Sequence, residues 1–166
     1  MHAQRAFTLI EMLIVLTLLA IFAQMAVPSL QDFIERNRQQ ALFDQVSRAI
    51  YNARTYAVTH RVQVELCASS DGVTCDQDWS QGWLLHEMDQ TEPIAVTQLN
   101  NKQQQLHWSG FRPRIRFNSA GISPTSNGRF YSCSKQEISW QLILNRQGRL
   151  RTANTTENSA QIARCN

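Results

Sequence analysis

The stretch FTLIEMLIVLTLLAIFAQMAV, Phe7–Val27, decides how this chain is organised. Only four of its residues are polar, namely Thr8, Glu11, Thr17 and Gln24. As an α-helix rising about 1.5 Å per residue, it is long enough to cross a bilayer core of about 30 Å. Arg5 precedes it, so the positive-inside rule predicts a cytoplasmic N-terminus.

Two simple interpretations of this stretch compete. A cleaved secretory signal has a shorter apolar core and a small-residue cleavage site after it, whereas this run leads directly into more helical sequence. A plain membrane anchor fits the length but leaves Glu11 unexplained. A carboxylate at the bilayer centre costs about 2.5–3.5 kcal/mol on insertion scales, so Glu11 requires a cationic partner.

The helical pattern continues beyond Pro28, where a missing N–H and a ring clash predict a bend. Apolar residues recur at steps of three and four: Leu30, Phe33, Ile34, Leu42, Val46, Ala49, Ile50, Ala53 and Ala57. We therefore expect one helix from Phe7 to about Thr59. Its first half is apolar on all sides and has to be buried against other chains once it leaves a membrane.

From Arg61 onward the apolar period changes from helical to alternating. Val62, Val64 and Leu66 alternate with Gln63 and Glu65, which predicts a half-buried strand. Further short strands are expected at 82–86, 94–99, 106–110, 114–121, 129–134, 137–145 and 149–153. One long helix followed by strands predicts an α+β fold with the helix packed on an antiparallel sheet. Within it, Trp79, Gly82 and Trp83 are assigned to the core and to turns.

The N-terminal residues Ala6-Phe7-Thr8-Leu9-Ile10-Glu11, followed by the apolar run, resemble the processing site of type IV pilins and type II secretion pseudopilins. The resemblance implies that prepilin peptidase cuts between Ala6 and Phe7 and that the new N-terminus at Phe7 is methylated. It also implies that Glu11 pairs with the terminal amine of a neighbouring pilin during assembly. The family usually has glycine where this chain has Ala6.

The resemblance extends along the chain. The segments CASSDGVTC (67–75) and DWSQGWLL (78–85), with a cysteine near the C-terminus, resemble the GspH/FimT group of minor pilins and pseudopilins. The implied organisation is a leader at 1–6, a transmembrane and filament-core helix at 7–28, its amphipathic continuation at 29–60, and a β-rich head at 61–166. The implied location is the inner membrane, with one span, a cytoplasmic N-terminus and a periplasmic head, and afterwards an extracellular pilus.

Four cysteines, an even number, indicate disulfides in an oxidising compartment. Three connectivities are possible. In the pilin-like topology, Cys67–Cys75 closes a short loop and Cys133–Cys165 fixes the C-terminal tail to the head. The sequence leaves the choice among the three open.

Enzymatic chemistry and metal binding find little support in the residues. The sequence contains no nucleophile elbow, phosphate loop or His–Asp constellation, so we expect neither an enzyme nor a cofactor. Zinc sites usually show ligands paired at short spacing, whereas the cysteines and histidines stand singly. Asp71, Asp76 and Asp78 do not have the spacing of an EF-hand loop. We therefore expect no metal.

Charge is distributed unevenly along the chain, whose formal net charge is +3. Residues 62–101 contain seven acids and no Lys or Arg, whereas residues 110–166 contain nine bases and two acids. Arg149 and Arg151 flank Leu150, so on a strand both project to one face, and Arg146 lies at the same hairpin tip. Gly148 suits the turn. The same alternation places Arg112, Arg114 and Arg116 together. Solvated strand faces are the plainer interpretation.

The four residues Gly148-Arg149-Leu150-Arg151 resemble the Gly-Arg-x-Arg motif near the C-terminus of FimT-type minor pilins, which is associated with DNA binding in natural transformation. The resemblance implies that double-stranded DNA is held by its phosphate backbone without sequence preference, with affinity that falls as salt rises. Two alternatives remain. The arginines could protect an edge strand from pairing, and the chain could be a structural tip subunit or an H-type pseudopilin.

Overall fold

The computed structural model describes residues 8–99 and 105–165. Helix α1 runs over Leu9–His60 and continues through Pro28. The chain forms two compact units, Met1–Arg38 and Gln39–Asn166. In the first unit the described side chains of α1 are exposed apart from half-buried Glu35, and this part of the helix is long and apolar enough to cross a membrane. Leu30, Phe33 and Ile34, expected on the apolar side of the helix, are exposed here.

In the second unit α1 turns one apolar side towards the protein core. Leu42, Val46, Ile50, Ala53 and Ala57 are buried and follow the expected steps of three and four. They share a single core with residues from both sheets. Because each of these side chains removes apolar surface from water, the helix is held in this unit by packing along one stripe.

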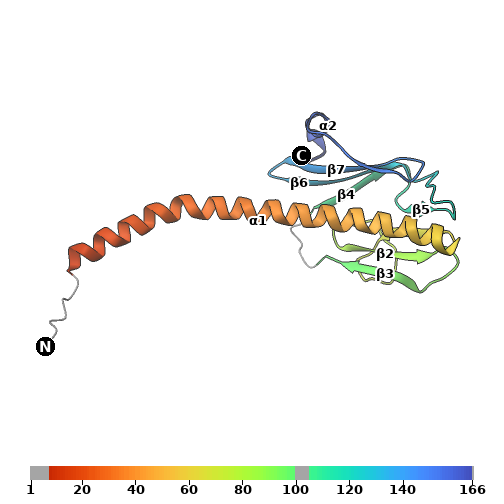
Figure 1. Ribbon diagram of the computed structural model, residues 1–166, viewed down its shortest axis with the longest axis horizontal. Helices are drawn as coiled ribbons and strands as arrows, with labels where there is room; N and C mark the ends of the chain where they lie inside the picture. The colour runs from red at the N-terminus through yellow and green to blue at the C-terminus, as the bar shows by residue number, and fades with distance from the viewer. Residues whose placement is uncertain (1–7, 100–104, 166) are drawn as a thin grey trace. The chain divides into compact units, whose positions relative to one another are not determined.

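The antiparallel sheet system that follows the helix consists of two sheets (Figure 1). The first has the order β3-β2-β1-β5, with β1 at Val64–Ala68, β2 at Gly82–Glu87, β3 at Pro93–Gln98 and β5 at Ile115–Phe117. The second has the order β4-β6-β7-β8, with β4 at Leu106–Gly110, β6 at Gly128–Ser134, β7 at Glu137–Leu144 and β8 at Leu150–Thr152. The α+β class with a long N-terminal helix is confirmed.

The core joins aromatic side chains from loops and strands. Phe130 is fully buried, with its ring edge-on to Trp79 at 4.8 Å and tilted against Trp108 at 4.6 Å. Trp83 is also buried, as expected. Gly82 begins β2 with φ +139°. Its missing Cβ matters, because a Cβ there would lie 2.2 Å from the Thr97 carbonyl oxygen.

Two disulfides join Cys67 to Cys75 and Cys133 to Cys165. The second ties the C-terminal 3₁₀ helix η1, Ile162–Cys165, to strand β6. Between β8 and η1 lies the short helix α2, Thr155–Ser159, which the sequence did not predict. A capping box starts it, because Asn154 and Glu157 each accept a hydrogen bond from the other's backbone N–H. The C-terminal segment is thus held at one end by the capping box at Asn154 and at the other by the disulfide at Cys165.

Candidate nucleic-acid interface

The turn between β7 and β8 presents the predicted arginines. The Asn145 N–H donates to the Arg149 carbonyl at 3.0 Å, and the Gly148 N–H donates to the Asn145 carbonyl at 3.0 Å. The Asn145 side chain also accepts from the Arg149 N–H at 2.9 Å. From helix α1, Arg54 Nη1 donates to the Gly148 carbonyl at 2.9 Å. The turn is therefore fixed both internally and to the helix.

Gly148 is required by its backbone conformation and by its surroundings. Its φ is +72°, in the left-handed region, and a Cβ there would lie 2.4 Å from the carbonyl oxygen of Gly121. We expect Gly148→Ala to lower the free energy of unfolding by about 1–3 kcal/mol, measured by urea denaturation of the chain in detergent. Gln147→Ala, at an exposed neighbour in the same turn, should stay within about 0.5 kcal/mol. Equal losses for both variants would contradict the steric explanation.

Register places arginines in a row across the outer face of the second sheet. Ser109 pairs with Arg129, Arg129 with Ile143, and Ile143 with Arg151, on strands β4, β6, β7 and β8 in turn. Their neighbours Trp108, Phe130, Leu142 and Leu150 alternate with them and point the other way, since successive side chains of a strand lie on opposite faces. Arg129 and Arg151 therefore share a face with Ile143 between them.

An open hollow of about 820 Å³ lies at the turn end of this face, and we name it the arginine groove. It is lined by Ser109, Gly110, Phe111, Asn127, Gly128, Arg129, Ile143, Leu144, Asn145, Arg146, Gln147 and Arg164. The side chain of Phe111 is 70% exposed. The groove combines three guanidinium groups with an exposed aromatic ring.

Within the described residues, the hydrogen bonds of the three groove arginines go to neutral groups, and Arg129 is also near enough to the Glu157 carboxylate to interact with it electrostatically. Arg129 Nη1 donates to Gln141 Oε1 at 3.1 Å, and Arg146 Nε donates to Asn127 Oδ1 at 3.4 Å. Arg164 donates to Gln161 Oε1 at 2.6 Å and to Ser109 Oγ at 3.0 Å. Arg149 is exposed, and its guanidinium has no hydrogen bond or ion pair with any residue in the described ranges. These four positive charges are therefore available to an anion.

Arg151, by contrast, is neutralised within the chain. Its two terminal nitrogens donate to both carboxylate oxygens of Glu157, at 2.9 and 2.7 Å. These bonds, with the backbone N–H of Asn154, lower the pKa of Glu157 to about 2. Glu157 is thus ionised at neutral pH and competes with any external anion for Arg151.

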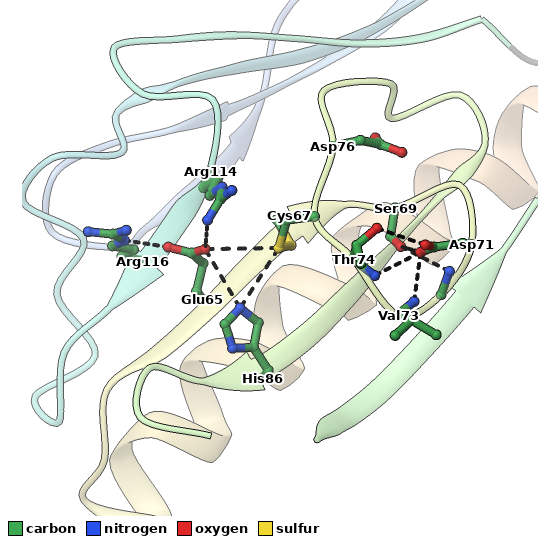
Figure 2. Close-up of a disulfide and its surroundings, with 12 residues drawn as sticks. Glu65, Cys67, Ser69, Asp71, Val73, Thr74, Asp76, His86, Arg114 and Arg116 are labelled. Carbon is green, nitrogen blue, oxygen red and sulfur yellow. Dashed lines mark hydrogen bonds and ion pairs between the residues drawn. A yellow bond between two sulfur atoms is a disulfide. The ribbon is translucent and has the colours of Figure 1, made fainter. Parts of the chain in front are cut away.

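The other predicted arginines belong to the first sheet and its edge. Arg114 Nη1 donates to Glu65 Oε1 at 2.8 Å, and Arg116 Nε donates to Glu65 Oε2 at 2.5 Å (Figure 2). Arg112 lies over the Phe111 ring, with its guanidinium carbon 5.6 Å from the centroid. Glu65 is therefore the counterion of both Arg114 and Arg116, whereas Arg112 lies over the Phe111 ring instead.

The burial of Glu65 differs from what the sequence pattern predicted. Alternation placed it on a polar strand face, but its side chain is only 2% exposed and all five residues of β1 are buried. Burial alone would raise the pKa of Glu65, but hydrogen bonds and charges from Arg116 and Arg114 outweigh it and hold the pKa below its usual range. The expectation failed because a second segment of the chain covers this face.

The acidic loop near the first disulfide uses its carboxylates internally. Asp71 accepts hydrogen bonds from Ser69 Oγ, the Val73 N–H, and both the N–H and the Oγ1 of Thr74 (Figure 2). The bond from the Thr74 N–H is the main cause of a pKa for Asp71 well below its usual range. Asp76 accepts from the Ser70 N–H, and Asp78 from Ser80. These groups shape the loop.

Two groove arginines were missed by the sequence-based prediction, Arg129 and Arg164. Arg129 precedes buried Phe130 on β6, so strand alternation could have placed it outward. No local pattern marks Arg164, which reaches the groove because the Cys133–Cys165 disulfide holds η1 against the sheet. At the other end of the chain, Ala6 and Phe7 lie outside the described residues. Glu11 lies in the first turn of α1, where its N–H donates to Thr8 Oγ1 at 3.3 Å.

Comparison with known proteins agrees with this architecture. Residues 1–26 match the prokaryotic N-terminal methylation motif. No curated protein sequence matches the chain closely enough to count as a relative. The fold is similar to that of the type IV minor pilin FimU of Pseudomonas aeruginosa strain PAO1. In its P21 crystal form, FimU is 18% identical with a TM-score of 0.61, over 75% of this chain and 94% of FimU.

A second crystal form of FimU, in space group P65, is 16% identical with a TM-score of 0.55, over 70% of this chain and 94% of FimU. At this identity the likeness concerns the fold, which is that of a type IV pilin. Residues 43–148 match the family described as type II transport protein GspH, and this match covers more than half of the chain. With a methylation motif at its start and a pilin-like fold over 75% of its length, the chain belongs to the GspH family of minor pilins and pseudopilins.

Proposed function

We propose that this chain is a minor type IV pilin that binds double-stranded DNA through the arginine groove and the adjoining β7–β8 turn, and so supports DNA uptake in natural transformation. The observation that carries the proposal is the set of four arginines, Arg129, Arg146, Arg149 and Arg164, that form no hydrogen bond or close ion pair with a carboxylate in the described part of the chain. A guanidinium presents parallel N–H donors that match phosphate oxygens.

Two paired glycines form part of the lining of the arginine groove. Gly110 pairs with Gly128 there, and a Cβ on Gly128 would lie 2.5 Å from the Gly110 Cα. The Trp108 indole also lies 2.3 Å from where a Cβ on Gly110 would stand and 2.7 Å from one on Gly128, so the two glycines make room for this ring, and phosphate contact is left to Arg129 and Arg146 in the groove lining. Contacts of this kind position a duplex without reading its sequence, and exposed Phe111 offers one apolar surface beside them. The predicted lack of sequence preference fits this arrangement.

The remaining parts of the proposal come from the pilin N-terminus. Prepilin peptidase cuts between Ala6 and Phe7, and Phe7 is then methylated. Glu11 pairs with the N-terminal amine of a neighbouring pilin. The single apolar helix holds the precursor in the inner membrane with the head in the periplasm, until assembly carries the head to the surface in the pilus. The methylation motif and the long exposed apolar helix support this sequence of events.

Anisotropy of a labelled duplex, titrated with the full chain in detergent, tests the DNA-binding site. We expect Arg146→Gln with Arg149→Gln to weaken binding about tenfold or more at physiological salt, because each residue supplies a phosphate contact. The slope of log affinity against log salt should fall in magnitude by about 1.8, which is 0.9 for each lost contact. Arg146 and Arg149 are chosen over Arg151 because Glu157 already occupies Arg151.

Arg36→Gln with Arg48→Gln is the matched control, since both residues are exposed on α1 and the change in net charge is the same. This control should retain most of the affinity. An equal loss in both double variants would place binding elsewhere on the protein. Absence of binding by the wild type at low salt would exclude the proposal itself.

A structural minor pilin or H-type pseudopilin without DNA binding is the second candidate. It is favoured by the intramolecular partners of three predicted arginines: Arg114 and Arg116 on Glu65, and Arg151 on Glu157. Stabilisation of the fold is enough to explain these three arginines without any contact to DNA. The wild-type titration at low salt separates this candidate from the first.

A further inference from the structure

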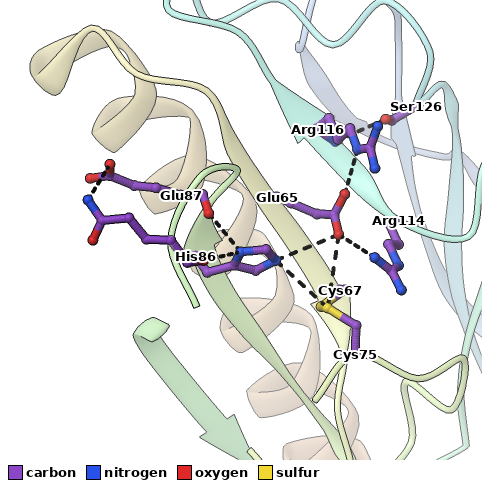
Figure 3. A network of polar contacts seen from close by, with 9 residues as sticks. Glu65, Cys67, Cys75, His86, Glu87, Arg114, Arg116 and Ser126 are labelled. Carbon is purple, nitrogen blue, oxygen red and sulfur yellow. Dashed lines mark hydrogen bonds and ion pairs between the residues drawn. A yellow bond between two sulfur atoms is a disulfide. The ribbon is translucent and has the colours of Figure 1, made fainter. Parts of the chain in front are cut away.

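Four side chains of the kinds that ligate metal ions meet at the first disulfide: Glu65, Cys67, Cys75 and His86 (Figure 3). One donor atom from each lies within 4.8 Å of the other three. The fold brings them together for simple reasons. Glu65 and Cys67 are two apart on β1 and share a face, and His86 on β2 pairs directly with Glu65. The loop that follows β1 returns Cys75 beside Cys67.

The distances among these donors are close to those of a tetrahedral zinc site. Zinc bonds of about 2.0–2.3 Å imply donor-to-donor distances of about 3.3–3.8 Å along the edges of a tetrahedron. In the structure, Cys75 Sγ lies 3.8 Å from His86 Nε2 and 4.0 Å from Glu65 Oε1. His86 Nε2 lies 3.6 Å from Glu65 Oε1. The two bonded sulfurs would have to move apart, and those donors that lie up to 4.8 Å from one another would have to close in.

His86 is oriented as metal-binding histidines usually are. Its Nδ1 lies 2.8 Å from the Glu87 carbonyl and 3.3 Å from the Gln90 carbonyl. Both partners are acceptors, so Nδ1 carries the proton and donates it. Nε2 is then left facing Glu65 and the sulfurs, as Figure 3 shows. A backbone carbonyl that fixes the ring through the other nitrogen is the common support of a histidine ligand.

The cluster can be reached from outside. A hollow of about 470 Å³ is lined by Cys75, His86 and Met88 among others. Cys75 and His86 are half-buried, whereas Cys67 is fully buried and the Glu65 side chain is 2% exposed. An ion entering through the hollow would therefore meet two donors at the rim and two donors below them, in a site sheltered from water.

We propose that the reduced form of this cluster binds one Zn²⁺ ion, held by the Cys67 and Cys75 thiolates, His86 Nε2 and a Glu65 oxygen. A dithiol reductant supplies two electrons and two protons to the Cys67–Cys75 bond and is itself oxidised to a disulfide. Zinc then displaces the two thiol protons, which pass to solvent. The same thiols exist before the disulfide first forms, so zinc and oxidation compete for them. The proposal does not depend on DNA binding.

Charge balance favours a divalent, thiophilic ion. In the disulfide form, Arg114 and Arg116 contribute two positive charges against one negative charge from Glu65. Two thiolates with one Zn²⁺ add no net charge to this set. Arg116 bonds Glu65 Oε2 and Arg114 bonds Oε1 at 2.8 Å, and a carboxylate oxygen has a second lone pair, so Oε1 can also face the ion while both arginines keep their partner. Calcium and magnesium prefer oxygen donors only, and therefore do not fit a set with two sulfurs.

Zinc uptake by the full chain in detergent tests the site. The protein is reduced with a phosphine, freed of metal and titrated with Zn²⁺ against a chromophoric chelator. We expect one zinc per reduced chain and none in the oxidised chain. His86→Gln should weaken binding at least tenfold, because a ligand is lost. His107→Gln, a histidine on β4 that stacks on Tyr131 instead, should leave the affinity unchanged. Cobalt in place of zinc should show tetrahedral thiolate absorption.

Two further measurements keep the test decisive. Cys133→Ser with Cys165→Ser removes the second pair of cysteines, and the reduced double variant should still bind one zinc. If reduction loosens the fold, zinc should restore the near-ultraviolet circular dichroism. The proposal is overturned if the reduced wild type takes up no zinc, if His86→Gln binds as tightly as wild type, or if binding follows Cys133 and Cys165.

Discussion

Replacing Arg114 and Arg116 together by methionine is expected to lower the free energy of unfolding by about 3 kcal/mol, because removing the partners of a buried charge leaves it uncompensated. The Glu65 carboxylate is that charge, since its side chain is only 2% exposed and both of its oxygens are held by these arginines. Urea denaturation followed by tryptophan fluorescence measures the loss, as all four tryptophans lie beyond residue 78.

Adding Glu65→Leu to the double variant provides the control. It removes the unpaired carboxylate, so most of the lost stability should return. Acidity gives a second check. In the wild type the folded-state pKa of Glu65 is lowered, so its contribution is present above about pH 4.5 and is lost as the pH falls through the folded pKa. In the double variant, burial raises the pKa of Glu65 instead. The difference in unfolding free energy between the wild type and the double variant should therefore become smaller as the pH falls. A loss that is independent of Glu65 would contradict this account.

Phe130→Ala is expected to cost about 3–5 kcal/mol of unfolding free energy, the range for large-to-small changes at fully buried aromatic positions. The ring is 0% exposed and packs against Trp79 and Trp108, so its removal leaves a cavity that rigid neighbours cannot fill. The same urea titration measures it. Phe111→Ala, at a ring that is 70% exposed, should stay within about 0.5 kcal/mol. Similar losses at both positions would mean that the second sheet is not the packed core described here.

Most helix and strand positions in the second unit could be predicted because one side of the element faces the core. The spacing of Leu42, Val46 and Ile50 predicted the buried side of α1, and all three are buried. Alternation failed at Glu65 on β1. It predicts a solvated face only where no other segment covers that face, and here Arg114 and Arg116 come from 49 and 51 residues further along the chain. A strand face that is covered by residues so far along the chain cannot be recognised from the local sequence pattern.

The candidate site could be predicted only where one hairpin contains it. The Gly148-to-Arg151 motif identified the turn, and its glycine does adopt a positive φ. The partner of Arg151 could not be predicted, because Glu157 reaches it through a helix cap that the sequence pattern did not reveal. Arg164 joins the groove through a disulfide whose connectivity the sequence left open. The chemistry of each arginine depends on which carboxylate the fold brings to it, and that is a tertiary property.

The hydrogen bond from Arg54 to the Gly148 carbonyl has a mechanical consequence. If the chain is the DNA-binding pilin that we propose, retraction of the pilus puts bound DNA under tension, and the head must transmit that pull to the filament. A load applied at the β7–β8 turn would then be shared between the covalent path through β7 and β8 and this bond, which leads directly to α1. The β7–β8 strands would then carry only part of the force, and the turn would keep its shape under tension.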